Sequence, residues 1–482
     1  MLSTYYKVRG IIKTTIRMNK TSFLTIIIAF AFSISISAQE KFDGLWGGLI
    51  QSSGIELEVN FEVQTAANRV LLSVPLQKIN DQVGLGMEIK GDSIFFDYSN
   101  FRASYKGKYD AEKQEIIGQW TQGLSTTLNL KRIEEKTKIV RLQVPKPPFP
   151  YTYENIKFHN EEADIHLAGT LTIPKGEGPF PLAILISGSG PQDRNSEILD
   201  HKPFLVIADH LSSNGIAVLR YDDRGVKNSE GNFTQSTSAD FATDAAAAIK
   251  YGHTLDKIDT SKIGLIGHSE GGLIAPKVAA DYGNVDFIVS IAGPAVPISE
   301  LMTIQNKMIF EKLGMSDVGL AIIEAKLPGI YAIVNQDKEP KELFDTLIKE
   351  VKLFYNELPE LDQKMLGQSS SAYYTAISST FFTPWFRYFL AYDPGPTWQK
   401  VSCPVLALNG SEDIQVNSKE NLAAIEKYLD LAGNKNHTEI ELKGFNHLMQ
   451  QCKVCSLQEY AAIETTFDPI ALDLITDFLK GL

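Results

Sequence analysis

Apolar and polar residues follow two different patterns along this chain, and the first pattern lies near its beginning. Over residues 55–64 apolar and polar residues alternate strictly, which is typical of an antiparallel strand with one buried face and one wet face. Similar short segments, separated by Gly, Asp and Asn, indicate further strands at residues 70–74, 93–98, 102–105, 115–120 and 127–130. Short strands at this spacing predict a small all-β domain, a sandwich or barrel, over residues 39–135.

The second pattern consists of continuous apolar runs that alternate with helix-like stretches. Buried strands are predicted at residues 181–186, 216–221, 263–266, 285–291, 404–408 and 438–442, after an antiparallel hairpin at 153–158 and 166–173. Helices are predicted between them at residues 202–213, 239–250 and 273–281. This β/α alternation predicts an α/β domain with a mostly parallel sheet over residues 153–482.

A proline-rich segment separates the two regions. Residues 136–152 contain four prolines within six positions, Pro145 to Pro150, which favour an extended spacer. We therefore predict a linker and a domain boundary there.

The sixth and seventh predicted strands are separated by residues 293–402, far more than a crossover needs. The pattern is helical there, with candidate helices at 300–313, 317–325 and 341–353. An insertion at this point would cover the active-site end of the sheet as a cap. A group of aromatic residues ends it, and these either shape a substrate pocket or only pack the cap onto the body: Phe381, Phe382, Trp385, Phe386, Tyr388 and Phe389.

Residues 1–38 carry five basic side chains and no acidic one, followed by an apolar run at 23–32 and a small residue, Ala38. This is the pattern of a secretory signal peptide, with an uncleaved membrane anchor as the alternative. We expect export to the periplasm or the extracellular space and, after cleavage, no stable membrane span. The net charge of −12 argues against nucleic acid as a partner, since nucleic-acid binding needs a basic surface.

The most informative motif is Gly267-His268-Ser269-Glu270-Gly271, which lies between a predicted strand and a predicted helix. That context is typical of a nucleophile elbow, in which a serine occupies a strained turn at the end of a strand. The alternative is a glycine-rich turn with no chemistry. We predict Ser269 as a nucleophile.

A serine hydroxyl is a weak nucleophile at neutral pH, so the chain must also supply a base and an acid that orients it. His447 follows the last predicted strand, whereas the other histidines lie in predicted linker, strand or helix, or beside Ser269 with a side chain expected to point away, as for His268. Two carboxylates, Glu412 and Asp413, follow the strand at 404–408, and both remain candidates for the acid. The order serine, acid, histidine is the one used by α/β-hydrolases.

Two loops follow early strands of the sheet. The loop at residues 187–194 lies where this fold places an oxyanion donor, and we assign the backbone NH of Ser189, with the register open by one residue, beside the NH of Glu270. The loop at 222–225 has clustered charge, which indicates a structural ion-pair turn or, alternatively, a substrate contact.

Cys452 and Cys455 would form a small disulfide in an oxidising compartment, while a zinc site needs ligands that the sequence does not pair with them. We find no phosphate loop, dinucleotide fingerprint or EF-hand, so neither a cofactor nor a metal is expected.

Five motifs together resemble the exported bacterial α/β-hydrolase esterases of the EstD-like carboxylesterase group, which overlaps with serine aminopeptidase-like sequences. They lie at residues 187–194, 220–225, 267–272, 408–416 and 446–448. The resemblance implies an α/β-hydrolase fold with a helical cap insertion, preceded by a small all-β domain, and the triad Ser269, Asp413 and His447. One departure is Lys227, where the family more often has glycine.

The expected function is hydrolysis of small carboxylic esters, with short to medium acyl chains, through an acyl-enzyme intermediate. Two alternatives remain: a serine peptidase or aminopeptidase that uses the same triad, and a secreted binding protein whose hydrolase domain is inactive. The sequence indicates neither the natural ester nor the oligomeric state.

Overall fold

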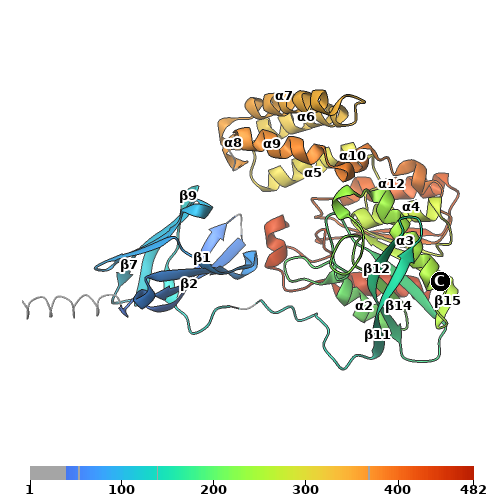
Figure 1. Ribbon diagram of the computed structural model, residues 1–482, viewed down its shortest axis with the longest axis horizontal. Coiled ribbons are helices and arrows are strands. Elements are labelled where there is room, and N and C mark those ends of the chain that lie inside the picture. Colours follow the sequence, from blue (N-terminus) through green and yellow to red (C-terminus); the bar gives the residue numbers. More distant parts are fainter. Residues whose placement is uncertain (1–39, 53–54, 138, 367–369) are drawn as a thin grey trace, which may run out of the picture. The chain divides into compact units, whose positions relative to one another are not determined.

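The computed structural model describes residues 40–52, 55–137, 139–366 and 370–482. The chain forms two compact units that divide between residues 138 and 139 (Figure 1). The predicted signal peptide, residues 1–38, lies outside the described residues. Within those residues, every helix is too short or too polar to cross a membrane.

The first unit is all-β, as predicted. Its antiparallel sheet has the order β4-β3-β2-β1-β10-β8-β7-β6-β5, with β9 paired to β8, and curves into a half-barrel (Figure 1). The strands are β1 Gly44–Ser52, β2 Ile55–Gln64, β3 Arg69–Val74, β4 Ile79–Val83, β5 Gly86–Lys90, β6 Ser93–Tyr98, β7 Ala103–Asp110, β8 Glu115–Gln122, β9 Leu124–Thr127 and β10 Leu130–Arg132.

Aromatic side chains fill the core of this unit. The ring of Phe61 lies 4.9 Å from that of Phe96 and 5.5 Å from that of Tyr105. Trp46 and Trp120 are both buried, in keeping with a core role. The described part of this unit thus has a hydrophobic core of its own.

The second unit is built on a mixed sheet with the order β11-β12-β14-β13-β15-β16-β17-β18. β11 and β12 form the predicted antiparallel hairpin, β12 pairs antiparallel with β14, and the other pairs are parallel. The strands are β11 Tyr151–Asn160, β12 Ile165–Pro174, β13 Phe180–Ile186, β14 Ala217–Tyr221, β15 Ile258–His268, β16 Ile288–Ile291, β17 Val405–Gly410 and β18 His437–Leu442.

Helices cover both faces of this sheet and bury two separate cores. On β13, Leu182 and Ile184 face one core, while Ala183 and Leu185 face the other, as the period of two requires. The first core includes side chains of α3 (Ser238–Gly252), α4 (Glu270–Asp281) and α12 (Ser418–Leu431), and the second those of α2 (Pro203–Ser213) and α13 (Pro469–Lys480). The predicted helices at 202–213, 239–250 and 273–281 are therefore confirmed.

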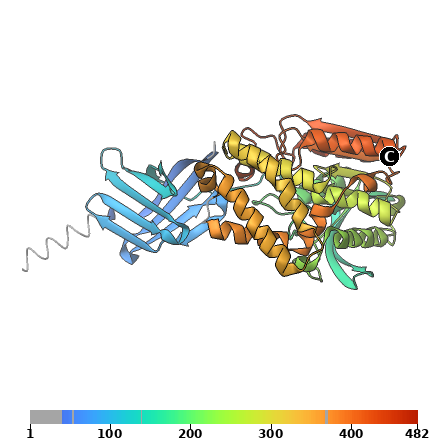
Figure 2. The same ribbon diagram turned by 90° about the horizontal axis from the view of Figure 1, so that it is seen from above.

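The insertion between β16 and β17 is helical, as expected, and its helices lie together in both views (Figures 1 and 2). They are α5 Ile298–Lys312, α6 Asp317–Val334, α7 Pro340–Glu357, α8 Glu360–Met365, α9 Ser370–Phe381 and α10 Pro384–Ala391, and a short α11, Gly395–Trp398, leads back to the sheet. Side chains of these helices form a core of their own. We call α5 to α10 the cap.

Part of the predicted spacer docks on the second unit. The guanidinium of Arg141 donates hydrogen bonds to the carbonyl oxygens of Leu199, Ala461 and Ile463 at 2.6–2.9 Å. The spacer is consequently anchored to the second unit at Arg141, which the proline count alone does not reveal.

Candidate active site

Ser269 occupies a sharp turn between β15 and α4, as the motif predicted. Its backbone has φ 54° and ψ −121°, a conformation that L-residues rarely adopt. The turn requires glycine on both sides, because a Cβ on Gly267 would lie 2.0 Å from the carbonyl oxygen of Gly271, and one on Gly271 would lie 2.2 Å from that of Ile186. The NH of Ser269 donates to Ile291 at 2.9 Å and fixes the turn to the neighbouring strand.

His447 and Asp413 come together at the carboxyl ends of β18 and β17. The Nδ1 atom of His447 lies 2.7 Å from Oδ2 of Asp413. The other oxygen of Asp413 accepts hydrogen bonds from the NH groups of Gln415 and Val416 at 2.8 and 2.9 Å. Between the two carboxylates that the sequence left open, the structure places Asp413, not Glu412, against the imidazole.

Ser269 and His447 line one cavity of about 260 Å³. Gly188 and Ser189 also line it, and so do five residues of the cap. The cap residues are Leu301, Met302, Gln305, Trp385 and Phe389. The cap therefore covers the predicted nucleophile and base.

The loop after β13 passes next to the nucleophile. A Cβ added to Gly188 would lie 3.1 Å from Cβ of Ser269, so the backbone on either side of Gly188 runs close to the serine. The NH of Glu270 belongs to the first turn of α4, where NH groups have no acceptor within the helix. The two predicted oxyanion donors thus belong to segments that border Ser269.

Asp223 is hydrogen-bonded to the loop that follows β13. Its carboxylate accepts hydrogen bonds from Oγ of Ser187 at 2.6 Å and from the NH of Gln192 at 2.9 Å. Burial, together with the nearby carboxylates of Glu270 and Asp244, raises the pKa of Asp223 to about 7. The loop that carries Ser189 is therefore tied to a buried and titratable group.

The neighbours of Asp223 in the charged turn form buried ion pairs. Asp222 pairs with the guanidinium of Arg194 at 2.7 Å, and Arg224 pairs with Asp244 at 2.7 Å. This bears out the structural interpretation of residues 222–225.

His268 was placed wrongly by sequence reasoning. Its ring centroid lies 4.8 Å from that of His447, its Nε2 donates to the carbonyl oxygen of His447 at 2.9 Å, and the residue lines the cavity. Burial and the adjacent His447 lower the pKa of His268 to about 3, so the ring is neutral. The strand's alternation does not extend through the strained turn at Ser269, which is why the expected direction was wrong.

The carboxyl group of Glu270 was also missed, because only its backbone NH had been assigned a role. It is buried and accepts hydrogen bonds from Oγ of Ser238 at 2.6 Å and from Nε1 of Trp385 at 2.8 Å. Burial raises its pKa. These partners lie 32 and 115 residues away along the chain, so no local sequence signal pointed to them.

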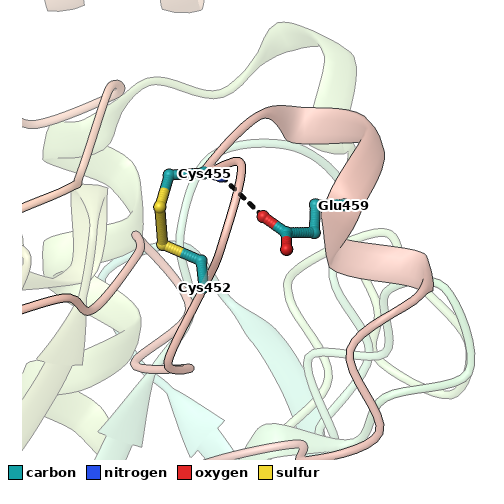
Figure 3. A group of neighbouring side chains, drawn as sticks. All are labelled: Cys452, Cys455 and Glu459. Atoms are coloured by element: carbon teal, nitrogen blue, oxygen red, sulfur yellow. Dashed lines mark hydrogen bonds between the residues drawn. A yellow bond between two sulfur atoms is a disulfide. The ribbon is translucent and has the colours of Figure 1, made fainter. Parts of the chain in front are cut away.

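Cys452 and Cys455 form a disulfide beside Glu459 (Figure 3). These three residues lie close enough to be considered as a metal site. However, the carboxylate of Glu459 accepts hydrogen bonds from the NH groups of Lys453, Val454 and Cys455, at 2.9, 2.9 and 2.6 Å. The two sulfurs are bonded to each other and the carboxylate already accepts hydrogen bonds, so these atoms are not free to bind a metal. The group instead stabilises the loop after His447.

Part of the chain is similar in sequence to known proteins. Residues 202–340 match the family Hydrolase_4, described as serine aminopeptidase, S33. The chain is 30% identical over 292 residues to esterase EstD of Thermotoga maritima, and the match covers 60% of this chain and 60% of that relative. The chain thus spans less than two thirds of the length of the curated relative.

Two solved structures are similar in part. An esterase of Pyrococcus furiosus is 15% identical, with a TM-score of 0.43, and the match covers 69% of this chain and 91% of that one. The ferulic acid complex of Est1E from Butyrivibrio proteoclasticus is 18% identical, with a TM-score of 0.37, and the match covers 68% and 96% of the two chains.

Proposed function

We propose that this chain, whose second unit is an α/β-hydrolase, hydrolyses carboxylic esters through Ser269, His447 and Asp413. The observation that carries the proposal is the 2.7 Å contact between His447 and Asp413 at the cavity that Ser269 lines. The similarity to an esterase supports the same chemistry.

In the proposed mechanism each group has one step. His447 takes the proton of the Ser269 hydroxyl as its oxygen attacks the ester carbonyl, and Asp413 holds the imidazole with Nδ1 protonated. The NH groups of Ser189 and Glu270 stabilise the oxyanion. His447 then protonates the departing alcohol, and water repeats the sequence on the acyl-enzyme.

The cavity lining favours an ester over the peptide substrate of an aminopeptidase. Among the described residues that line it, none is Asp, Glu, Lys or Arg, and the polar side chains are amides, hydroxyls, imidazoles and the indole of Trp385. An aminopeptidase has to bind a free α-ammonium group, and burying that charge without a carboxylate partner is costly. We therefore propose an uncharged ester of short to medium chain length as substrate.

The test compares p-nitrophenyl esters of rising acyl length with aminoacyl p-nitroanilides, for the wild type and Ser269→Ala. We expect the wild type to prefer the esters and the variant to lose activity, by up to about 10⁶ if it behaves like a serine protease. A preference for the anilides would assign the chain to the peptidases. Full activity in Ser269→Ala would exclude this triad, and no activity in the wild type on any substrate would favour an inactive binding protein.

We also propose that the protein is exported. The basic and apolar pattern of residues 1–38 supports this, as does the Cys452–Cys455 disulfide, since such bonds persist mainly in oxidising compartments. Expression of the full chain in a Gram-negative host, followed by fractionation and N-terminal sequencing, tests it. Cytoplasmic protein with an intact N-terminus would contradict export.

A further inference from the structure

A second cavity of about 200 Å³ lies inside the cap, between α5, α6, α7, α9 and α10. Apart from Asn306 and Thr380, its lining side chains are apolar or aromatic, Leu327, Ile330 and Phe354 among them. The amide NH₂ group of Asn306 is already used, because Nδ2 donates to the carbonyl oxygen of Met302 at 2.7 Å and to the hydroxyl of Tyr331 at 3.2 Å. An apolar cavity of about 150 Å³ holds a benzene molecule and stays dry without one, so this one suits a hydrocarbon.

This cavity shares a wall with the catalytic cavity. Met302 on α5 lines both cavities. On α10, Trp385 and Phe389 line the catalytic cavity, whereas Phe386 lines the one inside the cap. Methionine is unbranched and flexible, so a change of its rotamer is a low-cost way to join the two spaces.

We propose that the cap cavity is the binding site for the distal part of a straight acyl chain whose carbonyl carbon lies at Ser269. This inference rests on the proposed ester hydrolysis and names the acyl group that it favours. A methylene group is about as large as a water molecule, which occupies about 30 Å³ in the liquid, so the cap cavity has room for about six methylenes. With the first carbons in the catalytic cavity, an acyl chain of about eight to ten carbons fills both spaces.

The experiment fills the cap cavity with a side chain from α6. Ile330→Phe places a larger side chain in the lining, and Ile323→Phe is the matched control, since Ile323 lies two turns earlier on α6 and is equally buried but does not line the cavity. The readout is the ratio of kcat/KM for p-nitrophenyl octanoate to that for p-nitrophenyl butyrate. Neither isoleucine lines the catalytic cavity.

Each methylene that is buried in the transition state contributes about fourfold to kcat/KM, the equivalent of about 0.8 kcal/mol. We expect Ile330→Phe to lower the octanoate-to-butyrate ratio by about tenfold or more while butyrate turnover stays within about twofold. Ile323→Phe should leave the ratio unchanged. An unchanged ratio in a folded Ile330→Phe variant overturns the proposal and leaves ester hydrolysis intact, whereas a wild type inactive on both esters refutes the proposed function itself.

A second pair of variants keeps the test decisive if either variant of the first pair does not fold. Val351 on α7 lines the cap cavity, and Leu347, one turn earlier and also buried, does not. Val351→Phe is expected to reproduce the loss of the octanoate preference, and Leu347→Phe to retain it. Equal ratios in these two variants, with normal melting temperatures, would likewise overturn the acyl-chain assignment.

Discussion

Asp413 and Glu412 are adjacent carboxylates, but only Asp413 contacts the imidazole of His447. In Asp413→Asn the side chain keeps its shape and loses the charge that selects the Nδ1-protonated tautomer. We expect kcat for p-nitrophenyl butyrate to fall by roughly 10⁴, as the equivalent change does in a serine protease. Steady-state kinetics at pH 8 measures this.

Glu412→Gln is the control for that substitution, because it makes the same chemical change one residue earlier. Its kcat should remain within about twofold of wild type. If the two variants lost activity equally, or if Glu412→Gln lost more, the assignment of the acid would be wrong.

Asp223 is expected to make the stability of the protein depend on pH. Its pKa is about 7 in the folded protein and 3.8 as the ordinary value, so between these pH values the folded state holds a proton that the unfolded state has released. Stability contributed by this group is present in full below about pH 4 and is lost as the pH rises to 7, on the order of 4 kcal/mol in all. Asp223→Asn should remove that slope.

Urea unfolding between pH 4.5 and pH 8, with the wild type and Asp223→Asn in parallel, measures this difference. The loss of hydrogen bonds from Ser187 and Gln192 affects the variant at every pH, so the difference between the two slopes is the relevant quantity. Parallel curves for the two proteins would show that Asp223 titrates normally.

At the scale of elements, an indole on α10 is hydrogen-bonded to the start of α4, next to Ser269. Nε1 of Trp385 donates to the carboxyl group of Glu270, whose own NH is the proposed oxyanion donor. Trp385→Phe removes this hydrogen bond and should lower kcat/KM for p-nitrophenyl butyrate by about tenfold, a fraction of the 10²–10³ that loss of an oxyanion donor costs.

Trp398 provides the comparison. It is fully buried, and among the residues that the structure describes its Nε1 has no hydrogen-bond partner. Trp398→Phe removes the same atoms as Trp385→Phe and is expected to lower the melting temperature, but to leave kcat/KM within about twofold. Equal activity losses in the two variants would indicate that the indole volume matters and the link to Glu270 does not.

The elements that the sequence predicted best are those with the strongest burial pattern. The continuous apolar runs of the second unit became β13 to β17 because such strands are covered on both faces. The alternating segment at 438–442 became the edge strand β18, which is only partly buried. Six strands were predicted in the first unit and the structure describes ten: β1, β4 and β5 were missed, and the single strand predicted at 127–130 covers the break between β9 and β10. β1 contains Gly44, Gly47 and Gly48, which interrupt its alternation, and β4 and β5 lie at the two ends of the sheet order, where exposed residues weaken the pattern.

For the candidate site, motif and chain order predicted the region of each group but not its partners. The position of Ser269 follows from local glycines, whereas the choice between Glu412 and Asp413 depends on how the loop after β17 folds onto His447. The carboxyl of Glu270 depends on Ser238 and Trp385, which only the tertiary structure brings to it. Local chemistry can be predicted from the sequence, but contacts between distant segments depend on packing that no single segment encodes.

At the scale of the whole molecule, the two units have separate hydrophobic cores. Every residue of the proposed triad, oxyanion donors and cap lies in the unit that begins at residue 139. A chain of residues 139–482 retains the Arg141 anchor and both sheet cores, and should therefore fold alone. We expect its kcat/KM for p-nitrophenyl butyrate to stay within about twofold of that of the full chain.

Calorimetry of the full chain, of residues 139–482 and of residues 40–138 tests whether the two units unfold independently. Because each unit buries its own core, the full chain should show two transitions, and each fragment should reproduce one of them. A fragment 139–482 that melts well below its transition in the full chain would mean that the β unit stabilises the second unit. If that fragment also lost ester hydrolysis while remaining folded, the β unit would have to contribute to the active site, which contradicts the location of the triad and the cap in one unit.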